Sequence, residues 1–305
     1  VFGKGETMMT SSKKYQNYGS GDRIFCVVNG FLLIMIFIIL LYPLLFIISA
    51  SFSADTTVMG LSLLPGKFSL AGYRAVFEYK DIWTGYVNSL IYMAAGTLLS
   101  LTLTVCCAYP LSRRDFAMRN FMMTLCMITM YFSGGLIPTF LTVRRLGMLN
   151  SMWAIILPGS MSVYNMIVMR TYFQTQIPDE LWDSAQLDGC GNIQFLFSIV
   201  LPLSGAILAV IGLFYAVGNW NSYFSALIYL TDRKKFPLSI ILREILITNS
   251  AKLEFMDLDT SMALQERQNL MKYSVIIVSS LPVLLIYPFV QKYFVKGVMI
   301  GAVKG

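Results

Sequence analysis

The stretch IPDELWDSAQLDGCGNIQFLFSIVLPLS, Ile177–Ser204, differs from the sequence on either side of it. It holds four acidic residues within ten positions, followed by two glycines and a proline, whereas long runs on both sides are almost uncharged. A charged residue at the centre of a membrane helix costs roughly 2.5–3.5 kcal/mol. Four acids together would cost about 10 kcal/mol, so this stretch is excluded from lipid. It therefore predicts a water-exposed segment between membrane spans.

The composition of the whole chain supports this interpretation. Of its 305 residues 56% are hydrophobic and 13% are charged, against about 25% charged in soluble domains. A membrane span needs about 20 apolar residues. Six runs without Asp, Glu, Lys or Arg meet this test: Ile24–Ala50, Tyr86–Leu111, Phe121–Leu141, Met152–Met169, Ile199–Leu230 and Tyr273–Val290. We expect an all-α polytopic membrane protein with six transmembrane helices, and disfavour a soluble core because its helices would keep polar faces.

The charged flanks give an orientation. The first run is longer than the 7–15 apolar residues of a signal peptide, so we expect an uncleaved first span. Basic residues before it and after the second run favour cytoplasmic termini, whereas Arg144 and Arg145 in a short outer loop argue against them. We expect cytoplasmic tails at 1–23 and 297–305 around a transmembrane domain at 24–296. The net charge of +7 fits basic flanks and gives no argument for nucleic acid.

Several kinds of chemistry are missing from the sequence. There is no histidine, which excludes His-based triads, zinc sites and proton relays, and the five cysteines have no metal-site spacing. GLSLLPGKF at 60–68 and GCGNIQ at 189–194 fall short of nucleotide-binding patterns. We therefore expect no catalytic residue, metal or cofactor, and any ATP would be bound by another chain. The lack of carboxylates in the spans disfavours an ion-driven carrier without excluding one.

The acidic stretch itself predicts two short helices. Pro178 suits a first helical position, and Gly189 suits a left-handed helix end. Asn192 is a plausible cap for the second helix, and Pro202 would kink or begin the next span. The first helix would have a weakly apolar face formed by Leu181, Ala185 and Leu187. The stretch is long for a connector and carries Trp and Phe, which suggests a docking surface.

The same stretch resembles the EAA loop of binding-protein-dependent ABC transporter permeases. That pattern is Glu-Ala-Ala, three residues, Gly, nine residues and Ile-x-Leu-Pro. The matching positions, with Asp in place of Glu and Ser in place of the first Ala, are Asp183, Ser184, Ala185, Gly189, Ile199, Leu201 and Pro202. The resemblance implies a coupling loop at 173–202 that docks a separate cytoplasmic ATPase, which places both termini inside.

Three further segments resemble the carbohydrate branch of these permeases. Within that branch they resemble the importers of polysaccharides and acidic oligosaccharides, which are relatives of the maltose permease pair. The three segments are Phe132–Asn150, Trp153–Phe173 and Gln291–Gly305. The resemblance implies one permease subunit of a sugar importer in a bacterial cell membrane. It implies as partners a second permease, two ATPase copies and an extracytoplasmic solute-binding protein. Alternatives are an ABC permease for another solute, a self-sufficient channel or secondary carrier, and, less favoured, a membrane enzyme.

A polar cluster in the fifth run is a candidate for the substrate path. GNWNSYF at Gly218–Phe224 combines amides and a hydroxyl, costly in lipid, with aromatic rings that suit the C–H faces of sugars. Contact between helices near the outer interface explains the same residues equally well. The candidates for the path are Trp220, Asn219, Asn221, Tyr223, Asn165 and Tyr131. Beyond them, the spacing of Leu238, Ile241 and Ile245 predicts an amphipathic surface helix.

Overall fold

The computed structural model describes residues 20–53, 67–248, 271–288 and 291, and within these ranges the chain is helical. The only β contact among the described residues is an isolated antiparallel bridge between Ser53 and Phe68. The all-α class is thereby confirmed. The predicted tails fall mostly outside these ranges, and residues 20–23 of the expected amino-terminal tail already belong to the first helix.

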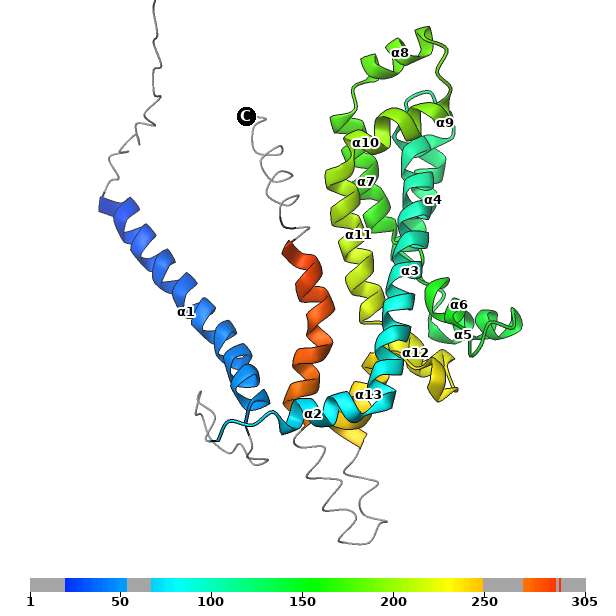
Figure 1. The fold of residues 1–305 in the computed structure, drawn as a ribbon. Coiled ribbons are helices and arrows are strands. Elements are labelled where there is room, and N and C mark those ends of the chain that lie inside the picture. The colour runs from blue at the N-terminus through cyan, green and yellow to red at the C-terminus, as the bar shows by residue number, and fades with distance from the viewer. Residues whose placement is uncertain (1–19, 54–66, 249–270, 289–290, 292–305) are drawn as a thin grey trace, which may run out of the picture.

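Helix α1 (Ser20–Ser51) stands apart from the other helices (Figure 1). Its apolar side chains are exposed along its length, with Phe25 70% and Leu40 64% exposed. Its contacts with the bundle gather at its C-terminal end, where the Ser51 hydroxyl lies 2.8 Å from that of Tyr73 and the Ser51 carbonyl accepts a hydrogen bond from Ser274. A helix that is apolar all round needs lipid or another protein around it.

The long helix α3 (Lys80–Ser112) is the centre of the bundle. Helices α4 (Arg119–Tyr131), α7 (Val163–Gln176) and α11 (Gly205–Trp220) pack along it (Figure 1). Inside this group the Thr104 and Tyr215 hydroxyls lie 2.7 Å apart. Tyr215 also accepts a hydrogen bond from the Ser162 backbone N–H, which ties α11 to the start of α7. These bonds satisfy polar groups in the core, which would otherwise be costly there.

Several predicted spans are interrupted. The third run is divided into α4 and α5 (Leu136–Arg145), which bend by 110° where Gly135 has a φ of +82°. In the fourth run α6 (Met152–Ile156) is separated from α7, and the fifth bends by 83° before α11. Three described helices are long and apolar enough to cross a membrane, or up to five if each bent pair is one span. Six straight spans are therefore not observed in the part of the chain that the structure describes, and the count of six stays a prediction.

Short helices cover the end of the bundle opposite α8 (Figure 1). They are α2 (Ala71–Glu78), α5, α6, α12 (Tyr223–Tyr229), α13 (Leu238–Arg243) and the single turns η2 (Arg233–Lys235) and η3 (Glu244–Thr248). Leu238, Ile241 and Ile245 are buried against α3 and the helix Met271–Pro288, which confirms the predicted amphipathic helix. Arg233 binds Asp81 at 2.8 Å and so joins this layer to the start of α3.

Candidate functional site

The acidic stretch projects beyond the ends of α3 and α7 (Figure 1). It forms α8 (Asp179–Leu187) and α9 (Asn192–Phe195), followed by η1 (Leu196–Val200) and α10 (Leu201–Leu203). The two predicted helices are confirmed. The bounds 173–202 of the coupling loop stay a prediction, and within them residues 173–176 form the last turn of α7. The chain then turns into α11 just after Pro202, which cannot donate a backbone hydrogen bond.

Gly189 closes the end of α8. Its φ is +77°, its backbone N–H donates to the carbonyl of Gln186, and that of Cys190 donates to the carbonyl of Ala185. This pair of bonds is the Schellman arrangement, which satisfies the last carbonyls of a helix and favours glycine. The left-handed turn predicted at Gly189 is confirmed. Two boundaries shift by one residue: Pro178 precedes α8, and Gly191 caps α9 in place of Asn192.

The buried face of α8 differs from the predicted one. Trp182 and Ala185 are buried at 7% exposure, whereas Leu187 is 90% exposed. Trp182 meets Phe195 of α9 edge-on, with ring centres 5.0 Å apart. The guanidinium of Arg113, directly after α3, lies 4.4 Å from the centre of the Trp182 ring. The expected apolar face is therefore correct at Ala185 and wrong at Leu187. The buried face includes Trp182 instead, which packs against Phe195 and Arg113.

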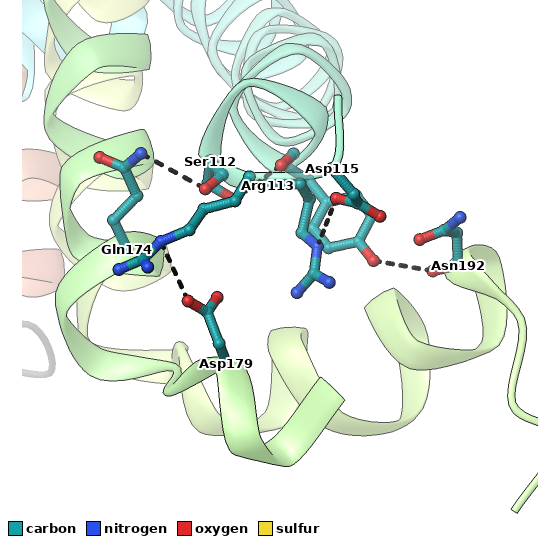
Figure 2. Close-up of polar contacts among 8 residues, drawn as sticks. Ser112, Arg113, Asp115, Gln174, Asp179 and Asn192 are labelled. Carbon is teal, nitrogen blue, oxygen red and sulfur yellow. Dashed lines mark hydrogen bonds and ion pairs between the residues drawn. The ribbon is translucent and has the colours of Figure 1, made fainter. Parts of the chain in front are cut away.

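Polar contacts hold the stretch to the end of α3 (Figure 2). Arg114 pairs with Asp179 at 3.0 Å, and the Tyr109 hydroxyl donates to the carbonyl of Asn192 at 3.1 Å. The buried Nε of Arg113 lies 3.5 Å from the Asp115 carboxylate, an ion pair without hydrogen-bond geometry. A cavity of about 420 Å³ lies between α8 and the ends of α3 and α7.

The outer surface of this stretch is exposed and mixed in character. Asp183 and Ser184 face solvent on α8, and the apolar Leu187, Ile193 and Phe197 are 90%, 75% and 64% exposed. We call the five the outer face of the loop. Exposed apolar side chains next to carboxylates are typical of a protein-binding surface.

Of the seven motif positions, some are exposed on the surface of the loop and the others pack in or against the hydrophobic core. Asp183, Ser184 and Pro202 are exposed, and Gly189 forms the exposed turn. Ala185 belongs to the main core cluster, and Ile199 and Leu201 pack against it half-buried. The motif therefore combines residues that can contact a partner with residues that fix the loop to the bundle.

The predicted path residues are only partly brought together. Trp220 and Asn221 line a cavity of about 300 Å³ together with Ser239, Ser279 and Ser280. Trp220 is itself 8% exposed and meets Tyr86 edge-on at 5.6 Å, so most of its surface is used in packing.

The remaining path candidates lie elsewhere. The Asn219 side chain lies against Gly96 of α3, and Tyr223 faces the guanidinium of Arg243 at 5.6 Å. Asn165 is buried near the start of α7, and Tyr131 is 78% exposed at the end of α4. None of these four is among the residues that line the cavity at Trp220.

Arg113 is a site residue that the sequence pattern does not single out. It stands with Arg114 and Arg119 in a short basic segment, which predicts only which side of the membrane the segment faces. A signal was nevertheless present, since an acidic loop containing Trp and Phe offers both carboxylates and ring faces to an arginine.

The chain is similar in sequence to known membrane proteins. Residues 96–300 match the family described as "Binding-protein-dependent transport system inner membrane component". The polygalacturonan/rhamnogalacturonan transport system permease protein YtcP of Bacillus subtilis (strain 168) is 42% identical, covering 93% of this chain and 99% of that protein. Protein LplC of the same organism is 39% identical, covering 93% and 96%.

A solved structure is also similar. It is described as a bacterial ABC transporter involved in the import of the acidic polysaccharide alginate. The similarity has a TM-score of 0.82 at 32% sequence identity, and covers 92% of this chain and 99% of that one.

Proposed function

Because the chain belongs to the family of binding-protein-dependent transport system inner membrane components, we propose that it is one permease subunit of an ATP-driven importer of oligosaccharides. It forms half of the membrane path beside a second permease. Two copies of an ABC ATPase bind on the cytoplasmic side, and a solute-binding protein delivers the sugar from outside. The names of the similar permeases and of the similar transporter support a saccharide as the substrate.

The observation that carries this proposal is the exposed outer face of the loop. Asp183 and Leu187 project from a helix that is fixed by a Schellman turn and by buried aromatic contacts. The motif spacing supports an EAA coupling loop, whose outer face lies in a groove of the ATPase. Closure of the ATPases around ATP then moves α8, and the path changes from inward-facing to outward-facing. The subunit is not itself the ATPase, and needs no cofactor of its own.

The path for the sugar runs past the cavity at Trp220 and Asn221. An indole, an amide and three serines line that cavity, and these residue types suit the C–H faces and hydroxyl edges of a saccharide. The other four candidate residues lie outside this cavity, and they either pack between helices or face the second permease. In this arrangement the protein lies in the cell membrane of a bacterium, with α8 and both termini in the cytoplasm.

Reconstitution of the full complex tests the proposal. The chain, a second permease, the ATPase and a solute-binding protein are reconstituted in vesicles, with ATP supplied to the ATPase side. We expect labelled oligosaccharide to accumulate only when ATP and binding protein are both present. Uptake that needs neither would show a self-sufficient carrier or channel. ATP-driven uptake of an amino acid in place of any sugar would contradict the substrate class.

A further inference from the structure

The contacts between α8 and α3 are few. A cavity of about 420 Å³ separates them, lined from the α3 side by Tyr109, Ser112, Arg113 and Arg114 and from the α8 side by Asp179 and Glu180. The loop joins the bundle through the chain at Ile177 and again after α9, and the Tyr109 hydroxyl of α3 donates to the carbonyl of Asn192 at the start of α9. Any force that passes from α8 to α3 directly must therefore pass through the side chains that cross this gap.

Two arginines cross the gap, and they differ in burial. The side chain of Arg114 is 82% exposed and pairs with Asp179, whose side chain is 47% exposed. Exposed ion pairs of this kind contribute little, about 0–1 kcal/mol. The side chain of Arg113 is 11% exposed. Its guanidinium faces the rings of both Trp182 and Phe195, at 4.4 Å and 5.6 Å from their centres. Cation–π contacts strengthen as water is removed, so Arg113 makes the stronger link.

The position of Arg113 in the chain suits a mechanical link. It caps α3, with its backbone N–H donating to the carbonyl of Pro110, so its side chain is attached directly to the end of that helix. A cation is favoured at a helix C-terminus. A flat guanidinium can stack on rings, and that of Arg113 lies over both rings with its Nε 3.5 Å from the carboxylate of Asp115. An ammonium group keeps the charge but cannot stack in this way.

We propose that Arg113 is a positioning residue for energy coupling: its guanidinium fastens the Trp182–Phe195 pair of the loop to α3, so that α8 and α3 move together. This inference rests on the proposed function. Because α3 has 33 residues, it extends about 50 Å and reaches α13 at the far end of the bundle. The link therefore gives α8 a direct route to the end of the molecule that receives the solute.

The test compares three variants in the reconstituted complex. Arg113→Met removes the charge and retains much of the volume, Arg113→Lys retains the charge, and Arg114→Met is the matched control on the neighbouring residue. The measurements are the ATPase copurified with the permease, basal ATP hydrolysis, and hydrolysis stimulated by sugar-loaded binding protein.

We expect Arg113→Met to retain the ATPase and basal hydrolysis, but to lose stimulation by about tenfold, equivalent to roughly 1.4 kcal/mol. Arg113→Lys should recover part of the stimulation, and Arg114→Met should behave like wild type. A split between basal and stimulated hydrolysis is not expected of a residue that only helps the loop to fold. Combining Arg113→Met with Trp182→Leu should give less than the sum of the single effects, because both remove one contact.

Two results would overturn the inference. One is full stimulation in Arg113→Met. The other is loss of the ATPase from both Arg113 variants, which would make Arg113 a folding residue of the docking surface. A wild-type complex that hydrolyses ATP without moving any sugar would instead contradict the proposed function.

Discussion

Gly189 shows how one residue sets the shape of the docking surface. Its φ of +77° disfavours any side chain by about 1–2 kcal/mol, although a Cβ atom there would meet nothing within 4 Å. We expect Gly189→Ala to lower stimulated ATP hydrolysis and Gly189→Leu to lower it further, since the larger side chain would also collide with the ATPase. Asn tolerates this conformation best among the alternatives, so Gly189→Asn should retain the most activity.

Gly191 provides the control for Gly189. It also has open space around it, but its φ is −83°, which any residue adopts. Gly191→Ala should therefore leave stimulated hydrolysis unchanged. Wild-type stimulation and transport in Gly189→Leu would mean that the loop is a plain connector.

For single residues, the sequence predicts backbone geometry better than it predicts which side chains come into contact after folding. The left-handed turn at Gly189 follows from residue type and spacing alone. The burial of Trp182 in place of Leu187 does not, because it depends on Arg113, which is distant in sequence and close only after folding. Spacing along one helix restricts the possible buried faces, but the neighbouring elements select among them.

At the scale of elements, Gly85 allows α13 to approach α3 closely. A Cβ atom added there would lie 2.5 Å from Cδ1 of Ile241 and 3.1 Å from the backbone of Leu238. The Ile241 tip can move, but the Leu238 backbone can move only with α13. We expect Gly85→Ala to lower the stability of the purified permease by about 1–3 kcal/mol, measured by thermal unfolding in detergent.

Gly218 provides the control for the Gly85→Ala experiment. It is also inside a helix, and nothing lies within 4 Å of a Cβ atom added there. Gly218→Ala should leave the unfolding temperature unchanged or raise it slightly, because alanine has the higher helix propensity. Equal unfolding temperatures for the two variants would show that α13 does not pack against α3 as described.

The sequence predicts which segments are helical, but it does not predict where each helix is interrupted. Apolar runs identify α1 and α3 correctly, and the spacing of Leu238 and Ile241 identifies α13. Glycines and prolines in the third and fifth runs indicate that a kink is possible. The bends of 110° and 83° depend on what lies on either side of each break, which the spacing does not contain.

At the scale of the whole molecule, the orientation in the membrane can be tested at Cys190. This half-buried thiol lies in the loop that we place in the cytoplasm. After replacement of the other four cysteines, a membrane-impermeant thiol reagent should label Cys190 in inverted vesicles and not in intact cells. Arg145→Cys in the same background, at the exposed end of α5, should show the reverse pattern. Labelling of Cys190 from outside would reverse the orientation of the whole chain.

The class of the molecule was evident from composition, and its assembly was not. Uncharged runs and the absence of histidine are enough to predict a membrane protein without His-based chemistry. Chain breaks divide several of the runs, as between α6 and α7, so the count of six spans stays a prediction. The sequence of one chain also leaves out the contacts of the proposed substrate path, because residues of the second permease would line part of it.

The length of α1 has a consequence for the bilayer. Its apolar part, Ile24–Ser51, has 28 residues and so measures about 42 Å, whereas the hydrocarbon layer is about 30 Å thick. A helix with this mismatch tilts, thickens the lipid around it or extends out of it. Tilting alone would carry its two ends about 30 Å apart in the membrane plane, roughly three helix diameters. The slope of α1 would then change with the thickness of the host membrane.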